Sequence, residues 1–141
     1  MKEETTRLLQ SLVYDDEEEF AELIRISRKY IKIDKVGGVI FLTSPTKRDT
    51  YQTVTLVLLS RYFAAELGLG GATMTIEEIQ VVTGLKNAKV KFAINRLKSQ
   101  GIVDAIGYNK IAQSGFRINW QKARIILAEL EDGEIPERDD V

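Results

Sequence analysis

A run of basic and amide side chains between residues 86 and 98 carries the clearest chemical signal in the sequence. Lysine and arginine bind phosphate oxygens, arginine also binds the O6 and N7 edge of guanine, and asparagine binds the edge of adenine. No acidic residue lies between Glu78 and Asp104, so nothing along this stretch repels a polyanion. It is therefore a candidate DNA-binding surface, made of Lys86, Asn87, Lys89, Lys91, Asn95, Arg96 and Lys98.

The charges of the chain balance overall but not locally. Twenty basic residues stand against 21 acidic ones in 141, for a net charge of −1. Residues 75–119 hold seven basic and three acidic residues, a net of +4, whereas residues 1–30 have a net of −3 and residues 120–141 a net of −4. A basic block between acidic ends is typical of a module that binds a polyanion, although ordinary solvated helix faces give the same pattern.

Several classes of enzyme are excluded by composition. The chain has no cysteine and no histidine, which removes disulfides, thiolate and imidazole metal sites, and Ser-His or Cys-His catalytic pairs. No P-loop, dinucleotide fingerprint or Gly-x-Ser-x-Gly elbow occurs. The carboxylates of 15–19 are consecutive, so on a helix they point in different directions and do not converge on a metal ion. We expect no enzymatic activity, no metal and no cofactor.

Two helices and a hairpin are predicted to position the basic run. Thr75 and Glu78 have the spacing of a capping box, which opens a helix that ends at Gly84. After a short turn, a second helix runs over 87–100, with its apolar residues on one stripe (Val90, Ala93, Ile94 and Leu97). Strands are predicted at 102–106 and 115–119.

The rest of the chain is predicted to be mostly helical. Asp49 can cap a long, largely apolar helix to about Leu67, followed by a short strand at 72–74. Before it we expect amphipathic helices at 3–13 and at 17–30, the second capped by Asp16, and a hairpin at 32–42. The expected units are 1–48 (two helices and a hairpin, a possible dimerisation extension), 49–119 (core), 120–132 (C-terminal helix capped by Asn119) and 133–141 (frayed acidic tail).

The sequence of the core resembles the winged helix-turn-helix family of DNA-binding regulators of archaea and bacteria. The resemblance covers roughly residues 49–119 and lies in the cadence Thr-Ile-Glu-Glu-Ile…Thr-Gly-Leu…Val…Ala-Ile-Asn-Arg-Leu…Gly-Ile-Val. It implies a mainly α protein with a small β content, a winged helix-turn-helix core and extra helices at both ends. It also implies that helix 87–100 lies in the major groove of DNA and that loop 107–114 touches an adjacent minor groove or phosphates.

Three further basic residues join the candidate site through this resemblance. Lys110 is the one basic residue of the loop. Lys47 and Arg48 lie at the start of the central helix, which in this family can approach the DNA backbone, and helix N-termini attract phosphate. The alternative is ordinary turn chemistry at Pro45–Asp49.

Two questions stay open at the level of sequence. Phe92 lies off the apolar stripe; we expect it to pack on the N-terminal helices, with a place at the DNA surface as the alternative. The terminal helices either pair two protomers or pack on their own core, and we expect a homodimer.

The expected function is that of a cytoplasmic, dimeric transcriptional regulator that binds double-stranded DNA and has no membrane association. The alternative is a winged-helix interaction module of a replication, transcription or RNA-processing assembly. The sequence is silent on any small-molecule effector.

Overall fold

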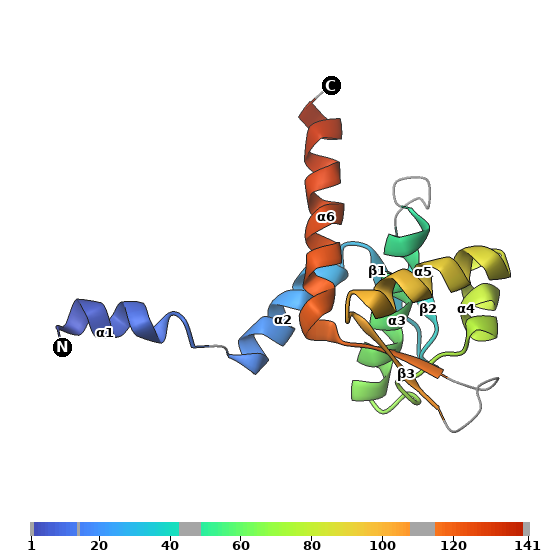
Figure 1. The fold of residues 1–141 in the computed structure, drawn as a ribbon, viewed down its shortest axis with the longest axis horizontal. Helices are drawn as coiled ribbons and strands as arrows, with labels where there is room; N and C mark the ends of the chain where they lie inside the picture. The colour runs from blue at the N-terminus through green and yellow to red at the C-terminus, as the bar shows by residue number, and fades with distance from the viewer. Residues whose placement is uncertain (1, 14, 43–48, 108–114, 140–141) are drawn as a thin grey trace.

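A computed structural model describes residues 2–13, 15–42, 49–107 and 115–139, with side chains as far as residue 131. Six helices and two short antiparallel hairpins are found in these residues (Figure 1). In chain order they are α1 (Glu3–Gln10), α2 (Asp16–Ser27), β1 (Ile31–Ile33), β2 (Val39–Phe41), α3 (Thr50–Glu66), α4 (Ile76–Thr83), α5 (Asn87–Ser99), β3 (Val103–Ile106), β4 (Gly115–Ile118) and α6 (Trp120–Asp139).

Helix α3 forms the centre of the hydrophobic core. It is apolar around most of its circumference, and most of its residues from Tyr51 to Ala64 are buried. Helices α4, α5 and α6 and the two hairpins pack around it. Burying a leucine or valine side chain contributes about 1.5–3 kcal/mol, so this helix holds the surrounding elements in place.

The order α3, extended segment, α4, turn, α5, hairpin is that of a winged helix. Met74 forms an antiparallel bridge with Phe116, which adds a third, very short strand to the β3–β4 hairpin. The prediction of a mainly α protein with small β content and a winged helix-turn-helix core is confirmed. Terminal helices flank this core, also as predicted.

The predicted turn chemistry is present between α4 and α5. Thr75 accepts a hydrogen bond from the backbone N–H of Glu78, and the Glu78 carboxylate accepts one from the backbone N–H of Thr75, which completes the capping box. Gly84 ends α4 with φ of 73°, a left-handed conformation that glycine adopts without strain. Residues 84–86 then turn the chain into α5.

The start of α2 differs by one residue from the prediction. Asp15, not Asp16, is the N-cap, and its carboxylate accepts from the backbone N–H of Glu18 at 3.1 Å. The helix ends at Ser27 rather than Tyr30. Residues 28–30 form a turn, and the Tyr30 carbonyl accepts a hydrogen bond from the backbone N–H of Leu42, beside the first hairpin. A run of five consecutive acidic residues offers more than one capping register, and sequence spacing alone does not separate them.

The two ends of the chain are covered to very different extents. Helix α6 packs against α2 and α3, with Ala123, Ile126, Leu127 and Leu130 buried. Arg124 pairs with Glu19, and Lys29 pairs with Glu131 at 2.6 Å. Helix α1, in contrast, extends away from the rest of the molecule (Figure 1), and none of its residues is buried.

The last helix is longer than predicted. Asn119 caps it through a 3.2 Å bond from the backbone N–H of Gln121, as expected, but the helical backbone continues to Asp139, through the region predicted to be a frayed tail. Once a helix is anchored by packing, each further residue adds one hydrogen bond at little cost, except Pro136, which has no backbone N–H. The acidic composition therefore did not indicate the end of the helix. None of the helices described is long and apolar enough to cross a bilayer.

Candidate nucleic-acid interface

Helix α5 has one buried face and one uncovered face. Val90, Ala93, Ile94 and Leu97 are buried against the core, as the apolar stripe predicts. The seven polar residues that the sequence assigns to this stretch are all exposed to solvent: Lys86, Asn87, Lys89, Lys91, Asn95, Arg96 and Lys98. No described element of the protomer covers them, so the surface is accessible to a ligand.

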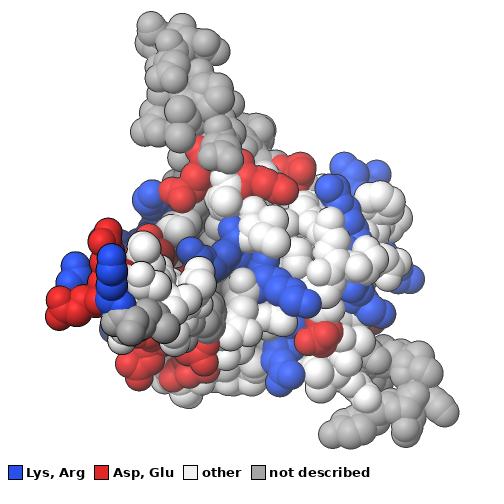
Figure 2. Space-filling view, turned by 60° about the vertical axis from the view of Figure 1, so that its left-hand side comes forward, with Lys and Arg blue, Asp and Glu red and all other residues white. Residues whose placement is uncertain are grey.

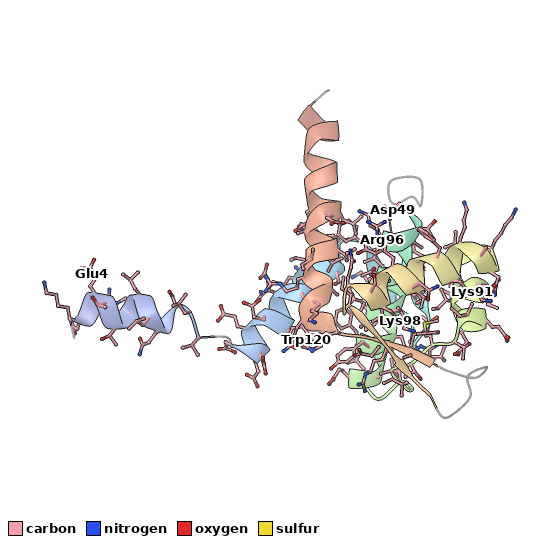
Figure 3. All side chains as sticks on the ribbon, in the orientation of Figure 1. Glu4, Asp49, Lys91, Arg96, Lys98 and Trp120 are labelled. Carbon is pink, nitrogen blue, oxygen red and sulfur yellow. The ribbon has the colours of Figure 1, made fainter. Side chains whose placement is uncertain are left out.

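The exposed face of α5 is divided into two basic rows with a neutral strip between them. Residues seven apart lie two helical turns along the same line, so Lys89 and Arg96 form one row and Lys91 and Lys98 the other. Figure 3 shows Arg96 near Asp49 at the start of α3, and Lys91 and Lys98 away from it. Between the rows lies the central strip, which consists of Ala88, Phe92, Asn95 and Ser99, all exposed.

Arg96 is held in place by a residue of another helix. Its guanidinium lies 4.0 Å from the centre of the Tyr51 ring, and the Tyr51 hydroxyl donates a hydrogen bond to Gln100 at the end of α5. Burial raises the pKa of the Tyr51 hydroxyl above its ordinary value, while the charge of Arg96 opposes the rise. The phenol therefore stays protonated as a donor, and the guanidinium keeps its outer N–H groups for a ligand.

The start of α5 is linked to α4. The side-chain amide of Asn87 donates to the side-chain oxygen of Gln80 at 3.0 Å, which occupies one of its two amide hydrogens. Lys86 is the N-cap residue of α5 and makes no side-chain capping bond. The first-turn amides of α5 are thus free of a side-chain cap, in a position where helix N-termini attract anions.

The position of Phe92 corrects the expectation that it packs on the N-terminal helices. It is 71% exposed and lies in the central strip. Helix α2 packs against α6 instead, and α1 extends away from the body, so neither is available to cover it. Phe92 forms one edge of a shallow hollow of about 400 Å³ between α5 and the start of α3, with Asp49, Thr50, Tyr51, Ala88, Lys89, Ala93 and Arg96 as its other lining residues.

Three predicted contact residues lie outside the described residues: Lys47, Arg48 and Lys110. At the start of α3, next to the first two, Asp49 caps the helix. Its carboxylate accepts from the backbone N–H of Gln52 at 2.8 Å, and the Gln52 side chain accepts from the backbone N–H of Asp49 at 3.1 Å. This helix end therefore already has a carboxylate on one of its amides, unlike the start of α5.

The charges seen on the surface follow the segments of the sequence. On the face shown in Figure 2, acidic side chains gather near the N-terminal helices and the base of α6. The charged side chains over the winged core are mostly basic. In the described part of the chain, no group of three or more Asp or Glu side chains is arranged to hold a metal ion. The uncovered surface of α5 can thus act through hydrogen bonds, positive charge and apolar contact.

The residues that support this surface from other elements were not found from the sequence. Tyr51 and Gln80 lie on α3 and α4, and each contacts α5 through a side chain. Their local patterns indicate only helix positions, because a contact between distant segments leaves no periodic signal in either one.

The comparisons with known proteins give a weak structural similarity. No family model matches the chain, and no curated protein matches it. The solved structure of a MarR family protein from Bacillus stearothermophilus is similar over 99% of this chain and 79% of that one, with 18% sequence identity and a TM-score of 0.37. The winged-helix assignment therefore rests on the order and packing of the chain's own elements.

Proposed function

We propose that this protein binds double-stranded DNA through α5, lying in the major groove, and acts as a dimeric transcriptional regulator. The observation that carries the proposal is the uncovered face of α5, with two basic rows on either side of a neutral strip. An α-helix with its side chains is about 10–12 Å across, and the major groove is about 12 Å wide. A helix seated in the groove therefore places its flanks near the two phosphate backbones and its middle near the bases.

The residue types match these positions. Lys89 and Arg96 on one flank, and Lys91 and Lys98 on the other, are cations of the kind that bind phosphate. Arg96 can also reach guanine as a forked donor, and Asn95 of the central strip can bind adenine. Lys86 adds charge at the start of α5, where the amides carry no side-chain cap.

The dimer is proposed from the apolar side of α1. Leu8, Leu9, Leu12 and Val13, in α1 and the turn after it, are all exposed. An isolated helix of eight residues is marginal in water, because its nucleation cost is not repaid over so short a length. Pairing with a second protomer would cover this apolar side and set the spacing of two α5 helices on DNA.

The test is binding of the full chain to a duplex of generic sequence, followed by fluorescence anisotropy over a series of salt concentrations. We expect the logarithm of the binding constant to fall linearly with the logarithm of salt concentration, with a slope of about −0.9 per phosphate contacted. Replacing both Lys91→Glu and Lys98→Glu should weaken binding at least about a hundredfold and make the slope shallower by about two units.

The control is Lys32→Glu with Lys35→Glu, which makes the same change in net charge at two exposed lysines of the first hairpin, away from α5 and from α1. It should bind nearly as well as the unmodified protein. Binding that ignores both salt and the α5 substitutions would overturn the proposal and favour a protein-interaction module. Degradation of the duplex after a divalent metal ion is added would favour a nuclease instead.

A further inference from the structure

Phe92 is the outlier among the aromatic side chains that the structure describes. The other four phenylalanines, Phe20, Phe41, Phe63 and Phe116, are all buried or half-buried in the core. Phe92 is 71% exposed, in the middle of the face that the two basic rows enclose. The core does not use this ring, so it is available to a ligand that approaches α5.

The surroundings of Phe92 favour a ligand that is apolar at one point and anionic on both sides. Lys89 and Arg96 lie on one side of the ring and Lys91 and Lys98 on the other. Ala88, one turn earlier on the same strip, lines the shallow hollow together with Phe92. Asp49 also lines the hollow, and its carboxylate accepts a hydrogen bond from the backbone N–H of Gln52 at the start of α3. A protein partner with an apolar patch would have to bring acidic groups to both flanks, whereas a DNA groove has phosphates on both sides by its construction.

Within the major groove, the C5-methyl group of thymine is the apolar feature that an amino-acid side chain meets. We propose that Phe92 is a specificity-determining residue that contacts thymine methyl groups, and that it makes the protein prefer A·T-containing sites. This inference rests on the proposed function. Asn95, one turn further along the strip, supports the same preference, because its amide matches the N6 and N7 groups of adenine.

The experiment compares two duplexes that differ only in the methyl group. One is an A·T-rich duplex, and the other has the same sequence with every thymine replaced by deoxyuridine. Anisotropy titrations are made with the unmodified protein, with Phe92→Ala, and with Val36→Ala as the matched control. Val36 is 82% exposed on the turn between β1 and β2, so the Val36→Ala variant loses exposed apolar surface at a place away from α5.

We expect the unmodified protein and Val36→Ala to bind the thymine duplex about fourfold more tightly for each methyl group contacted, the ratio that corresponds to burying one such group. Phe92→Ala should bind the thymine duplex more weakly and should not distinguish the two duplexes. Because the ring is exposed, this variant should unfold at the same temperature as the unmodified protein. A change in DNA shape caused by deoxyuridine would affect all three proteins alike, so the comparison isolates the ring.

Two results would overturn the inference while leaving the proposed function intact. One is salt-dependent DNA binding that is equally strong for both duplexes. The other is a Phe92→Ala protein that keeps the preference for thymine. A Phe92→Ala protein that sediments as a smaller species than the unmodified protein would place the ring in a subunit contact and overturn it too. If no duplex binds at any salt concentration, the proposed function fails and the inference fails with it.

Discussion

Helices α5 and α1 both present an uncovered face, but the two faces differ in chemistry. The uncovered face of α5 is cationic at its edges and neutral in the middle, while its opposite face is anchored in the core by Val90, Ala93, Ile94 and Leu97. Helix α1 has exposed leucines and no buried residue at all. An anchored helix with charged flanks suits an anionic groove, whereas an unanchored amphipathic helix with exposed leucines suits another protein surface.

The two helices gain their structure in different ways. Neither helix has a side-chain bond at its N-cap, which is Lys86 in α5 and Lys2 in α1. In α5 the missing cap is offset by burial of an apolar stripe, so its outer face can be devoted to a ligand. In α1 none of the described residues provides such burial, and an isolated helix of eight residues is marginal in water.

The largest effect is expected from placing charge on the apolar side of α1. Leu8 and Leu12 are 65% and 80% exposed, and burial of each in a dimer would contribute about 1.5–3 kcal/mol. Replacing both with glutamate should weaken dimerisation at least about a hundredfold, measured by sedimentation equilibrium. The thermal unfolding midpoint of the monomer should hardly change, because neither side chain is buried in the protomer.

A matched control for this change is Val36→Glu with Val81→Glu, two exposed valines on the first hairpin and on α4. These substitutions should leave the sedimentation behaviour as it is. A dimer that survives Leu8→Glu with Leu12→Glu would show that α1 has no part in it. If the unmodified protein is already a monomer, α1 does not pair two copies, and the proposed difference in role between α1 and α5 is wrong.

The next largest effect is expected on the affinity for DNA, and it tests whether the two basic rows of α5 are equivalent. If each row faces one phosphate backbone, Lys89→Glu with Arg96→Glu should weaken DNA binding by about as much as the same change at Lys91 and Lys98, again about a hundredfold. Anisotropy titration at one fixed salt concentration measures both pairs. A loss at one row and none at the other would mean that α5 lies on the surface of the DNA along one edge and not within the groove.

Much of this arrangement could be predicted from local patterns. The Thr75–Glu78 capping box and the left-handed turn at Gly84 depend on residues close together in the sequence, and the apolar stripe of α5 has the helical period. The exposure of the lysines follows from that stripe. These features fix where α5 begins and which of its faces is uncovered.

The features that could not be predicted depend on contacts between distant segments. The sequence position of Phe92 shows that it lies off the apolar stripe of α5. Whether another element covers its ring depends on where α1 and α2 pack. The capping register of α2 was ambiguous among consecutive acidic residues. The separation of α1 from the body has no local signal either, because an amphipathic helix looks the same whether its partner is its own core or another protomer.

The smallest effect concerns the contact between Arg96 and Tyr51, which sequence spacing did not indicate. Replacing Arg96→Lys keeps the charge of the row but loses the flat guanidinium that stacks on the Tyr51 ring. A cation on an aromatic ring at an exposed site contributes about 0.5–1 kcal/mol, so DNA binding should weaken about threefold with an unchanged salt slope. If the affinity does not change either, Arg96 acts only as a phosphate cation, and its position over Tyr51 does not matter for binding. A matched Lys98→Arg variant, which keeps charge in the opposite row, should leave the slope unchanged as well.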